Sequence, residues 1–176
     1  MSYRQLGVAI AAVLTLVGCA SMSVEECMVA NWNEQGYKDG RNGYAPTRII
    51  EHRKACAKAG MAPDAMRYRQ GWDAGVLQYC TPANGVAQGR AGSPYRNVCP
   101  PQLEGDFVYW YQQGKAVYDA QRRVDDLNRE VEQLQYQLHN ESDDRVRRHL
   151  RRELEDTWYQ LRRARDDLAW AERRSM

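Results

Sequence analysis

The sequence predicts an all-α protein, in which a small disulfide-stapled helical head is followed by a long antiparallel, coiled-coil-like helical hairpin. Three observations support this class. Helix-capping and helix-stopping residues punctuate the first half of the chain, cysteines recur between residues 27 and 99, and apolar residues recur at steps of three and four in the last third. The expected divisions are a signal peptide over 1–18, the head over 19–102 and the hairpin over 103–176.

Composition leaves room for one ordinary domain, or for a small domain with an appendage, in 176 residues. The 25 Lys and Arg residues and the 23 Asp and Glu residues nearly cancel. No broad electrostatic footprint for nucleic acid results, and no nucleic-acid partner is expected. A single Phe stands against 11 Tyr and 5 Trp, whose rings bury an apolar body and keep a polar tip. Thin cores are therefore expected.

Residues 1–18 have the features of a signal peptide. Arg4 precedes an apolar run from Leu6 to Val17, which is shorter than the roughly 20 residues that span a bilayer. The run ends in Leu16-Val17-Gly18-Cys19, which resembles the bacterial lipobox and is followed by small residues. We expect a covalent lipid on Cys19 as the anchor to the membrane, and no other cofactor. The alternative is an ordinary secretory signal with an incidental cysteine.

The residue after Cys19 is Ala20 and not Asp, which in enterobacteria-like sorting rules favours the outer membrane. The expected location is therefore the cell envelope, with the protein lipid-anchored at the periplasmic face of the outer membrane. Several acyl chains would hold it firmly, because a single chain binds only marginally.

The other four cysteines are expected to form two disulfides, because an exported chain folds in an oxidising compartment. Ser23 and Glu26 form a capping-box pattern, so a helix begins near Val24 with Cys27 in its first turn. A second helix over 47–59, stopped by Gly60, carries Cys56 in its last turn. Antiparallel packing of these two helices would bring the cysteines together and favours Cys27–Cys56.

A third helix is expected over 64–79, directly before Cys80. The stretch 81–101 is rich in Gly, Pro, Asn and Ser, and this composition predicts a loop. A disulfide Cys80–Cys99 would tie both ends of that loop, which is worth about 3 kcal/mol in the chain-entropy model. A zinc site is the alternative use of the four cysteines. Their spacing contains no CxxC pair, so no metal is expected.

Gly residues recur beside aromatic residues in the head. Four Gln-Gly pairs carry this pattern: Gln35-Gly36, Gln70-Gly71, Gln88-Gly89 and Gln113-Gly114. Gly inside a helix costs about 1 kcal/mol relative to Ala, so a shared reason is needed. The favoured reason is close helix packing. The alternative is an aromatic surface that binds sugar or peptide, with these candidate ligand residues: Trp32, Tyr68, Trp72 and Tyr111.

An ordered set of residues over about 24–115 carries a family resemblance. The set is Cys27, Trp32, Gly36, Asp39-Gly40, His52, Cys56, Gly60, Pro63-Asp64, Tyr68, Gly71, Gly75, Tyr79-Cys80, Gly85, Gly89, Gly92, Tyr95, Val98-Cys99 and Phe107. It resembles the proteobacterial lipoproteins grouped as domain of unknown function 2799. The resemblance implies a signal peptide and an envelope location, and it supplies no catalytic residues.

Two apolar seams of heptad type follow the head. The first comprises Val117, Ala120, Val124, Leu127, Val131, Leu134 and Leu138, and the second Leu150, Leu154, Thr157, Leu161, Ala164, Leu168 and Ala171. The break between them is His139 to Asp144, where Asn140 or Ser142 can cap a new helix. An antiparallel hairpin is expected. The alternative is one continuous helix in an oligomeric coiled coil.

The search for catalytic chemistry finds little. His52 and Cys56 share a helix face at a spacing of four, but the expected disulfide consumes the thiol. Asp39, Asp64 and Asp73 are expected as helix caps or, less readily, as ligand groups. We expect a non-enzymatic interaction or scaffold protein in the periplasm, whose residues 103–176 contact an envelope protein or a second copy. The alternative is a head that binds peptidoglycan or another glycan.

Overall fold

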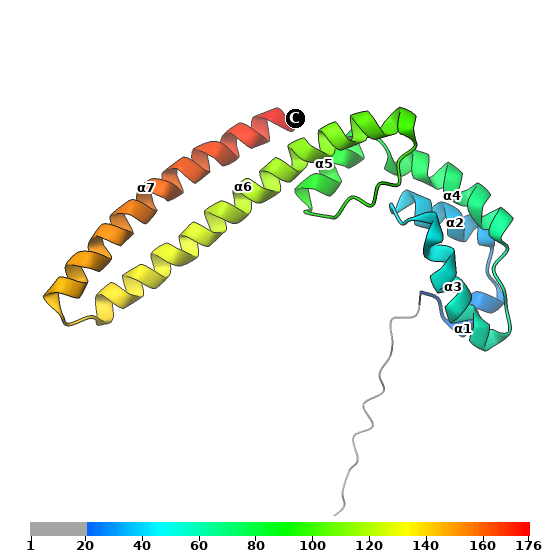
Figure 1. Ribbon diagram of the computed structural model, residues 1–176, viewed down its shortest axis with the longest axis horizontal. Coiled ribbons are helices and arrows are strands. Elements are labelled where there is room, and N and C mark those ends of the chain that lie inside the picture. The colour runs from blue at the N-terminus through cyan, green and yellow to red at the C-terminus, as the bar shows by residue number, and fades with distance from the viewer. Residues whose placement is uncertain (1–20) are drawn as a thin grey trace, which may run out of the picture.

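The computed structural model describes residues 21–176, and all regular secondary structure in this range is helical (Figure 1). The expected signal peptide and Cys19 lie outside the described residues. The elements are α1 (Val24–Met28), α2 (Trp32–Arg41), η1 (Pro46–Arg48), α3 (Ile49–Cys56), η2 (Ala57–Ala59), α4 (Ala65–Tyr79), α5 (Pro82–Arg90), α6 (Pro101–Asn140) and α7 (Asp144–Arg174). The predicted class, a disulfide-stapled helical head with a long helical hairpin, is confirmed. Within 21–176, no helix is both long and apolar enough to cross a membrane.

Polar caps set the helix starts. The predicted capping box is present, because Glu26 N donates to Ser23 Oγ at 3.1 Å and Ser23 N donates to Glu26 Oε2 at 2.7 Å. The cap of α7 differs from the prediction. Asp143, and not Asn140 or Ser142, accepts from the backbone N–H groups of the first turn of α7.

Helices α2 and α4 lie parallel and in close contact through glycine. A side chain on Gly36 or Gly40 would collide with the Tyr68 or Trp72 carbonyl group of α4. In return, the Asn33 carbonyl group of α2 lies where a side chain on Gly71 would stand. The residue numbers of the contacts increase in the same direction along both helices, so α2 and α4 are parallel. Close packing, the favoured explanation of the glycine repeat, is confirmed here.

Helices α5 and α6 repeat this arrangement. Gly85 and Gly89 of α5 face the Phe107 and Tyr111 carbonyl groups, and Gly114 of α6 faces Val86. The expected loop over 81–101 is therefore wrong in its first half. Thr81 caps a helix there and Pro82 occupies its first position, where the missing N–H has no cost. The glycines that suggested a loop are contact points between helices.

The two pairs match beyond their glycines. Gly43 and Gly92 each follow the first helix of a pair with positive φ, at 68° and 66°. A side chain at these positions would collide with the Tyr79 and Tyr118 rings, respectively. In the first unit Trp72 Nε1 donates to the Tyr44 carbonyl at 2.8 Å. At the corresponding place in the second unit, Tyr111 OH donates to the Ser93 carbonyl at 2.8 Å. The head is thus built from two versions of one helix-pair unit.

Both predicted disulfides are confirmed, Cys27–Cys56 and Cys80–Cys99. The reason given for the first needs correction. Helix α1 ends after five residues, and the main partner of the following helix α2 is α4, in parallel orientation. The first disulfide fastens α1 to the end of α3, and the second joins the start of α5 to the start of α6.

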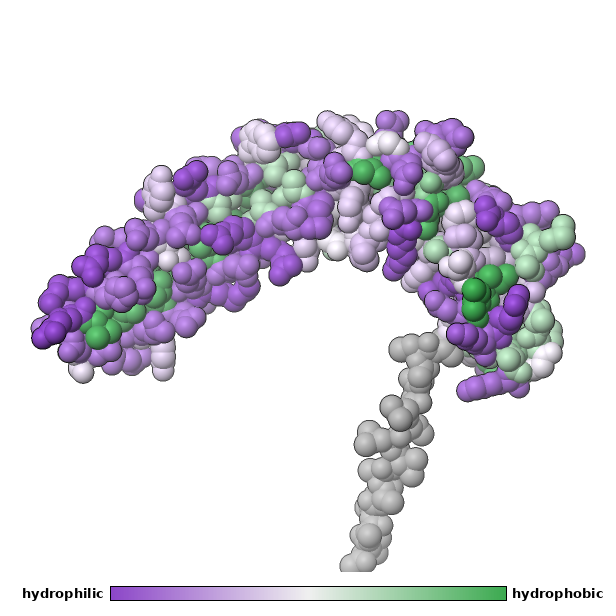
Figure 2. Space-filling view, in the orientation of Figure 1, coloured by the Kyte–Doolittle hydropathy of each residue, from purple (hydrophilic) through white to green (hydrophobic). Residues whose placement is uncertain are grey.

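Helices α6 and α7 form the predicted antiparallel hairpin. Val124, Leu127 and Val131 of α6 pack with Leu161 and Ala164 of α7 in one buried cluster. Figure 2 shows hydrophilic side chains over most of the hairpin, with hydrophobic ones along the seam. The expected division at residue 102 falls inside α6, which begins at Pro101 and serves both parts. Its first turns pack on α5, and the rest packs on α7.

The molecule is arched, with α7 on the outer side of the arch and the head turned toward the α6 side (Figure 1). The end of α7 is fastened to the head, because Arg90 Nη2 donates to Ser175 Oγ at 2.7 Å. Nothing in the described range covers the face of α7 that points away from α6 (Figure 1).

Candidate functional site

The residues expected to line a ligand surface are not available as one. Trp32, Tyr68 and Trp72 are buried in the core of the head. The polar groups of two of the candidate residues are also occupied, because the Trp72 indole N–H and the Tyr111 hydroxyl each donate a hydrogen bond to a backbone carbonyl. Tyr111 is half-buried and lies beside both the Tyr95 and the Phe107 ring. The predicted aromatic ligand surface is therefore wrong, and these rings are packing residues.

A polar network lies inside the first unit of the head. The Asp39 carboxylate of α2 receives a hydrogen bond from Tyr68 OH at 2.8 Å and lies 2.7 Å from His52 Nε2. The other ring nitrogen, His52 Nδ1, lies 2.9 Å from Ser21 Oγ. Gln35 and Arg48 complete the surroundings of the carboxylate, at 3.2 Å and 3.6 Å. This network joins α2, α3, α4 and the start of the described chain.

The network has the residue types of a serine hydrolase but not their accessibility. The His52 ring is 0% exposed, and Asp39 and Tyr68 are 4% and 1% exposed. His52 Nδ1 is within reach of Ser21 Oγ, but a general base must afterwards pass its proton to the leaving group of a substrate, and a ring with no exposed surface gives a substrate no access. Burial, followed by the hydrogen bond to Asp39, raises the pKa of Tyr68 far above its usual range, so Tyr68 stays a neutral donor. The polar side-chain atoms of Asp39, His52 and Tyr68 all have hydrogen-bond partners, as expected for a network that stabilises the fold.

Sequence reasoning missed this network. Asp39 was expected to cap a helix or bind a ligand, and His52 was considered only beside Cys56. The available signal was positional, because Asp39 lies three residues after the contact glycine Gly36 and therefore shares the side of α2 that faces α4. The other two aspartates are exposed: Asp64 caps α4 as expected, and Asp73 pairs with Arg69 at 2.8 Å.

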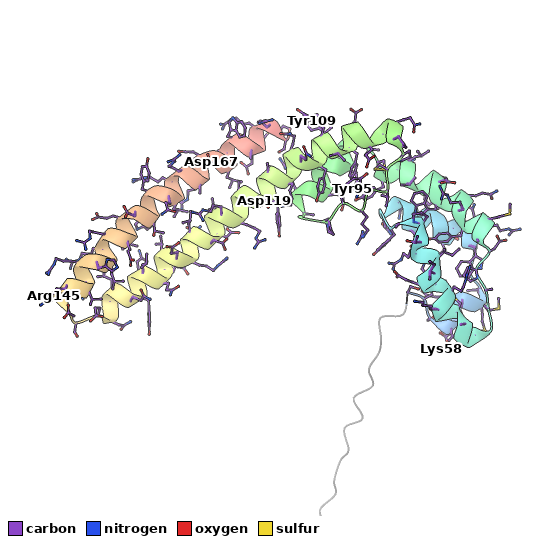
Figure 3. All side chains as sticks on the ribbon, in the orientation of Figure 1. Lys58, Tyr95, Tyr109, Asp119, Arg145 and Asp167 are labelled. Atoms are coloured by element: carbon purple, nitrogen blue, oxygen red, sulfur yellow. A yellow bond between two sulfur atoms is a disulfide. The ribbon has the colours of Figure 1, made fainter. Side chains whose placement is uncertain are left out.

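The outer face of α7 carries exposed aromatic and charged side chains. Tyr159 and Trp170 are 55% and 53% exposed, although their ring sizes would allow deep burial. Arg163 lies over the Tyr159 ring and Arg174 over the Trp170 ring, at 6.0 Å and 4.5 Å from the ring centres. Asp167, labelled in Figure 3, lies between the two ring pairs along the helix. This face therefore presents two exposed aromatic rings, each with an arginine beside it.

The basic cluster near the hairpin turn includes one residue with a structural role. Arg147 Nη1 donates to the Leu138 and Glu141 carbonyl groups at 3.0 Å and 2.8 Å, which satisfies the end of α6. Arg145, Arg148, Arg151 and Arg152 are exposed (Arg145 is labelled in Figure 3). Within 21–176, no group of three His, Cys, Asp or Glu side chains is placed to hold a metal ion.

Comparison with protein families identifies the head. A family model described as protein of unknown function (DUF2799) matches residues 31–116. The predicted resemblance to that family is therefore confirmed for this part of the chain. The match begins at the Asn31 cap of α2 and ends just after Gly114, so it covers both helix-pair units and leaves out most of the hairpin. Comparisons with curated proteins and with solved structures found no match to the chain.

Proposed function

We propose that the protein is a lipid-anchored, non-catalytic interaction protein of the cell envelope, held by Cys19 at the periplasmic face of the outer membrane. The head serves as a rigid base, and the hairpin is the contact element. The observation that carries the proposal is the outer face of α7, where Tyr159 and Trp170 are exposed on a helix whose own seam is already filled by α6.

The rigidity of the head supports this role. Two disulfides, two glycine-locked helix pairs and a buried polar network connect its segments. The bond from Arg90 to Ser175 extends this bracing to the end of the hairpin. A partner that contacts α7 would therefore be held in a defined position relative to the head.

The location follows from the lipobox-like residues Leu16 to Cys19. Lipidation at this cysteine would place Ser21, which contacts His52 in the head, only two residues from the membrane anchor. The base would then sit close to the lipid surface. A glycan-binding head is not proposed, because the aromatic residues suggested for it are buried.

Two experiments test the proposal separately. Labelled palmitate should enter the full chain and not a Cys19→Ser variant, and equal incorporation in both would refute the anchor. For the contact role, a photo-crosslinking residue at Tyr159 should capture a protein in the envelope, whereas the same residue at exposed Tyr109 of the head serves as the control. Equal capture from both positions, or none from Tyr159, would refute the hairpin as the contact element.

A further inference from the structure

Within residues 155–174, four charged doublets lie on the outward half of α7. They are Glu155-Asp156, Arg162-Arg163, Asp166-Asp167 and Arg173-Arg174. All eight side chains are exposed, and none makes a salt bridge with another residue of the described range 21–176. Opposite charges four residues apart, such as Arg162 and Asp166, are close enough on the helix to form a salt bridge, but they form none in the structure. Their charges are thus free to meet a partner.

The order of these doublets is self-complementary. The signs alternate along the helix as acidic, basic, acidic and basic, with separations of seven, four and seven residues. The pattern is symmetric in position and opposite in sign about the point between Ala164 and Arg165. If a second α7 runs antiparallel about that point, Glu155-Asp156 meets Arg173-Arg174 of the second copy. Arg162-Arg163 likewise meets Asp166-Asp167 of the second copy.

The aromatic residues obey the same symmetry. Tyr159 and Trp170 are equally far from the midpoint, so each ring would lie level with the other type of ring in the second copy. With about 100° per residue, both rings point almost directly away from the seam residues Leu161, Ala164 and Leu168. The charged doublets flank them on either side. An apolar pair in the middle with charges at its edges is the layout of a helix–helix contact.

We propose that two copies of this chain pair back to back through the outer faces of their α7 helices, in antiparallel orientation. The inference rests on the proposed role of the hairpin as the contact element and names its partner as a second copy. The paired stretch, 155–174, is about 30 Å long at 1.5 Å per residue. Each exposed ion pair contributes little energy, so the charges mainly choose orientation and register.

The pattern excludes the parallel alternative. In a parallel, in-register pair each doublet would face its own copy, so acidic residues would meet acidic ones and basic residues basic ones. The arch also leaves room for the antiparallel pair, because the head turns toward the α6 side and away from the outer face of α7 (Figure 1).

The proposed pairing is compatible with two copies anchored in one membrane. The two-fold axis that relates the two copies is perpendicular to the plane of the paired helices. Two copies in one membrane can therefore pair when that plane lies along the membrane. Anchoring in a shared surface raises the effective concentration, so a small interface suffices.

Charge reversal in the full chain tests the pairing. Two differently tagged copies are produced together, crosslinked with formaldehyde while both are in the intact membrane, then solubilised in mild detergent and tested for co-purification. The wild-type copies should co-purify. Arg162→Asp with Arg163→Asp should not co-purify with itself, and neither should Asp166→Arg with Asp167→Arg. These two variants mixed with each other should co-purify again, because the opposite charges are restored across the axis.

A matched control carries the same charge change outside the paired stretch. Arg148→Asp with Arg152→Asp lies on the same face of α7, but its positions would be level with points beyond Met176 of the second copy. This variant should co-purify like the wild type. The orientation has its own test, since a short bismaleimide should crosslink Asp166→Cys to itself and leave Arg148→Cys, about 50 Å from its counterpart, uncrosslinked.

Several outcomes would overturn the inference. Wild-type copies that do not co-purify, reversed doublets that still self-associate, or a mixed pair that is not restored would each do so, as would crosslinking of Arg148→Cys. A hairpin that captures another envelope protein at Tyr159 while the wild-type copies stay separate would refute the self-pairing and support the proposed function. Restored binding of the mixed variants cannot come from misfolding, so loss of folding does not mimic the expected result.

Discussion

The backbone carbonyl of Asn33 in α2 occupies the space in which a side chain on Gly71 of α4 would stand. Four residues further on, the Tyr37 carbonyl lies against Gly75 in the same way. Backbone packs directly on backbone, as in the small-residue contacts that let helices approach most closely. The two helices cannot move apart easily, because the buried hydrogen bond from Tyr68 OH to the Asp39 carboxylate also joins them.

Replacing a contact glycine should therefore destabilise the head strongly. Gly71→Ala would force α2 and α4 apart, and we expect a loss of about 3 kcal/mol or more in the free energy of unfolding. Gly105→Ala in α6 is the matched control. Its added Cβ meets nothing within 4 Å, so higher helix propensity should stabilise the protein by up to about 1 kcal/mol. Urea denaturation measures both, and equal effects would contradict the packing argument.

The buried network should contribute more to the free energy of unfolding than an exposed ion pair does. Asp39→Ala would leave His52 Nε2 and Tyr68 OH without their partner in a dry site, with an expected loss of about 3 kcal/mol. Asp73→Ala, which breaks the exposed pair with Arg69, should change the stability by about 0.5 kcal/mol or less. Similar urea midpoints for the two variants would show that the network does not stabilise the fold.

Stability should fall in alkaline solution. Burial raises the pKa of Tyr95 to about 12, and its hydrogen bond to Glu104 acts in the same direction. Tyr68 has its pKa raised by burial and then by Asp39. In the unfolded chain both phenols lose their protons near pH 10, whereas the folded chain retains them. The free energy of unfolding should thus be unaffected by these groups below about pH 10 and decrease as the pH rises toward 12 and beyond.

Substitution isolates this effect. In Tyr68→Phe the decrease between about pH 10 and pH 12 should be smaller than in the wild type, because one phenol no longer contributes. Tyr136→Phe, on an exposed part of α6, is the control and should keep the wild-type slope. Urea unfolding curves at several pH values give the slopes. Identical pH dependence in all three proteins would rule out the buried phenol as a cause.

The two disulfides should stabilise to a similar degree. They link residues 29 and 19 apart, and the chain-entropy model assigns about 3 to 4 kcal/mol to each. The paired substitutions Cys27→Ser with Cys56→Ser and Cys80→Ser with Cys99→Ser should therefore lower the urea midpoint by comparable amounts. A much larger loss for one pair would mean that its cysteines also matter through packing in the core.

Much of the fold could be predicted from local chemistry. The capping box at Ser23, the stop at Gly60 and the repeating apolar residues of the hairpin each depend on neighbours within one or two helical turns. The cysteine pairing was also predictable, although the antiparallel geometry used to argue it does not describe the main helix pair. The least accurate part was 81–101, where composition predicted a loop and the structure has α5. Composition cannot distinguish a glycine that loosens a chain from one that admits a neighbouring helix.

The sequence by itself determined the helical class, the hairpin seams, the two disulfides and the family resemblance, because periodicity, capping and cysteine spacing are written along the chain. Only the tertiary structure decided what faces what. It buried Trp32, Tyr68 and Trp72, joined Asp39 to His52 across 13 residues of sequence, and left Tyr159 and Trp170 on an open face. These outcomes depend on contacts between segments distant in the chain, and burial is a property of all the neighbours together.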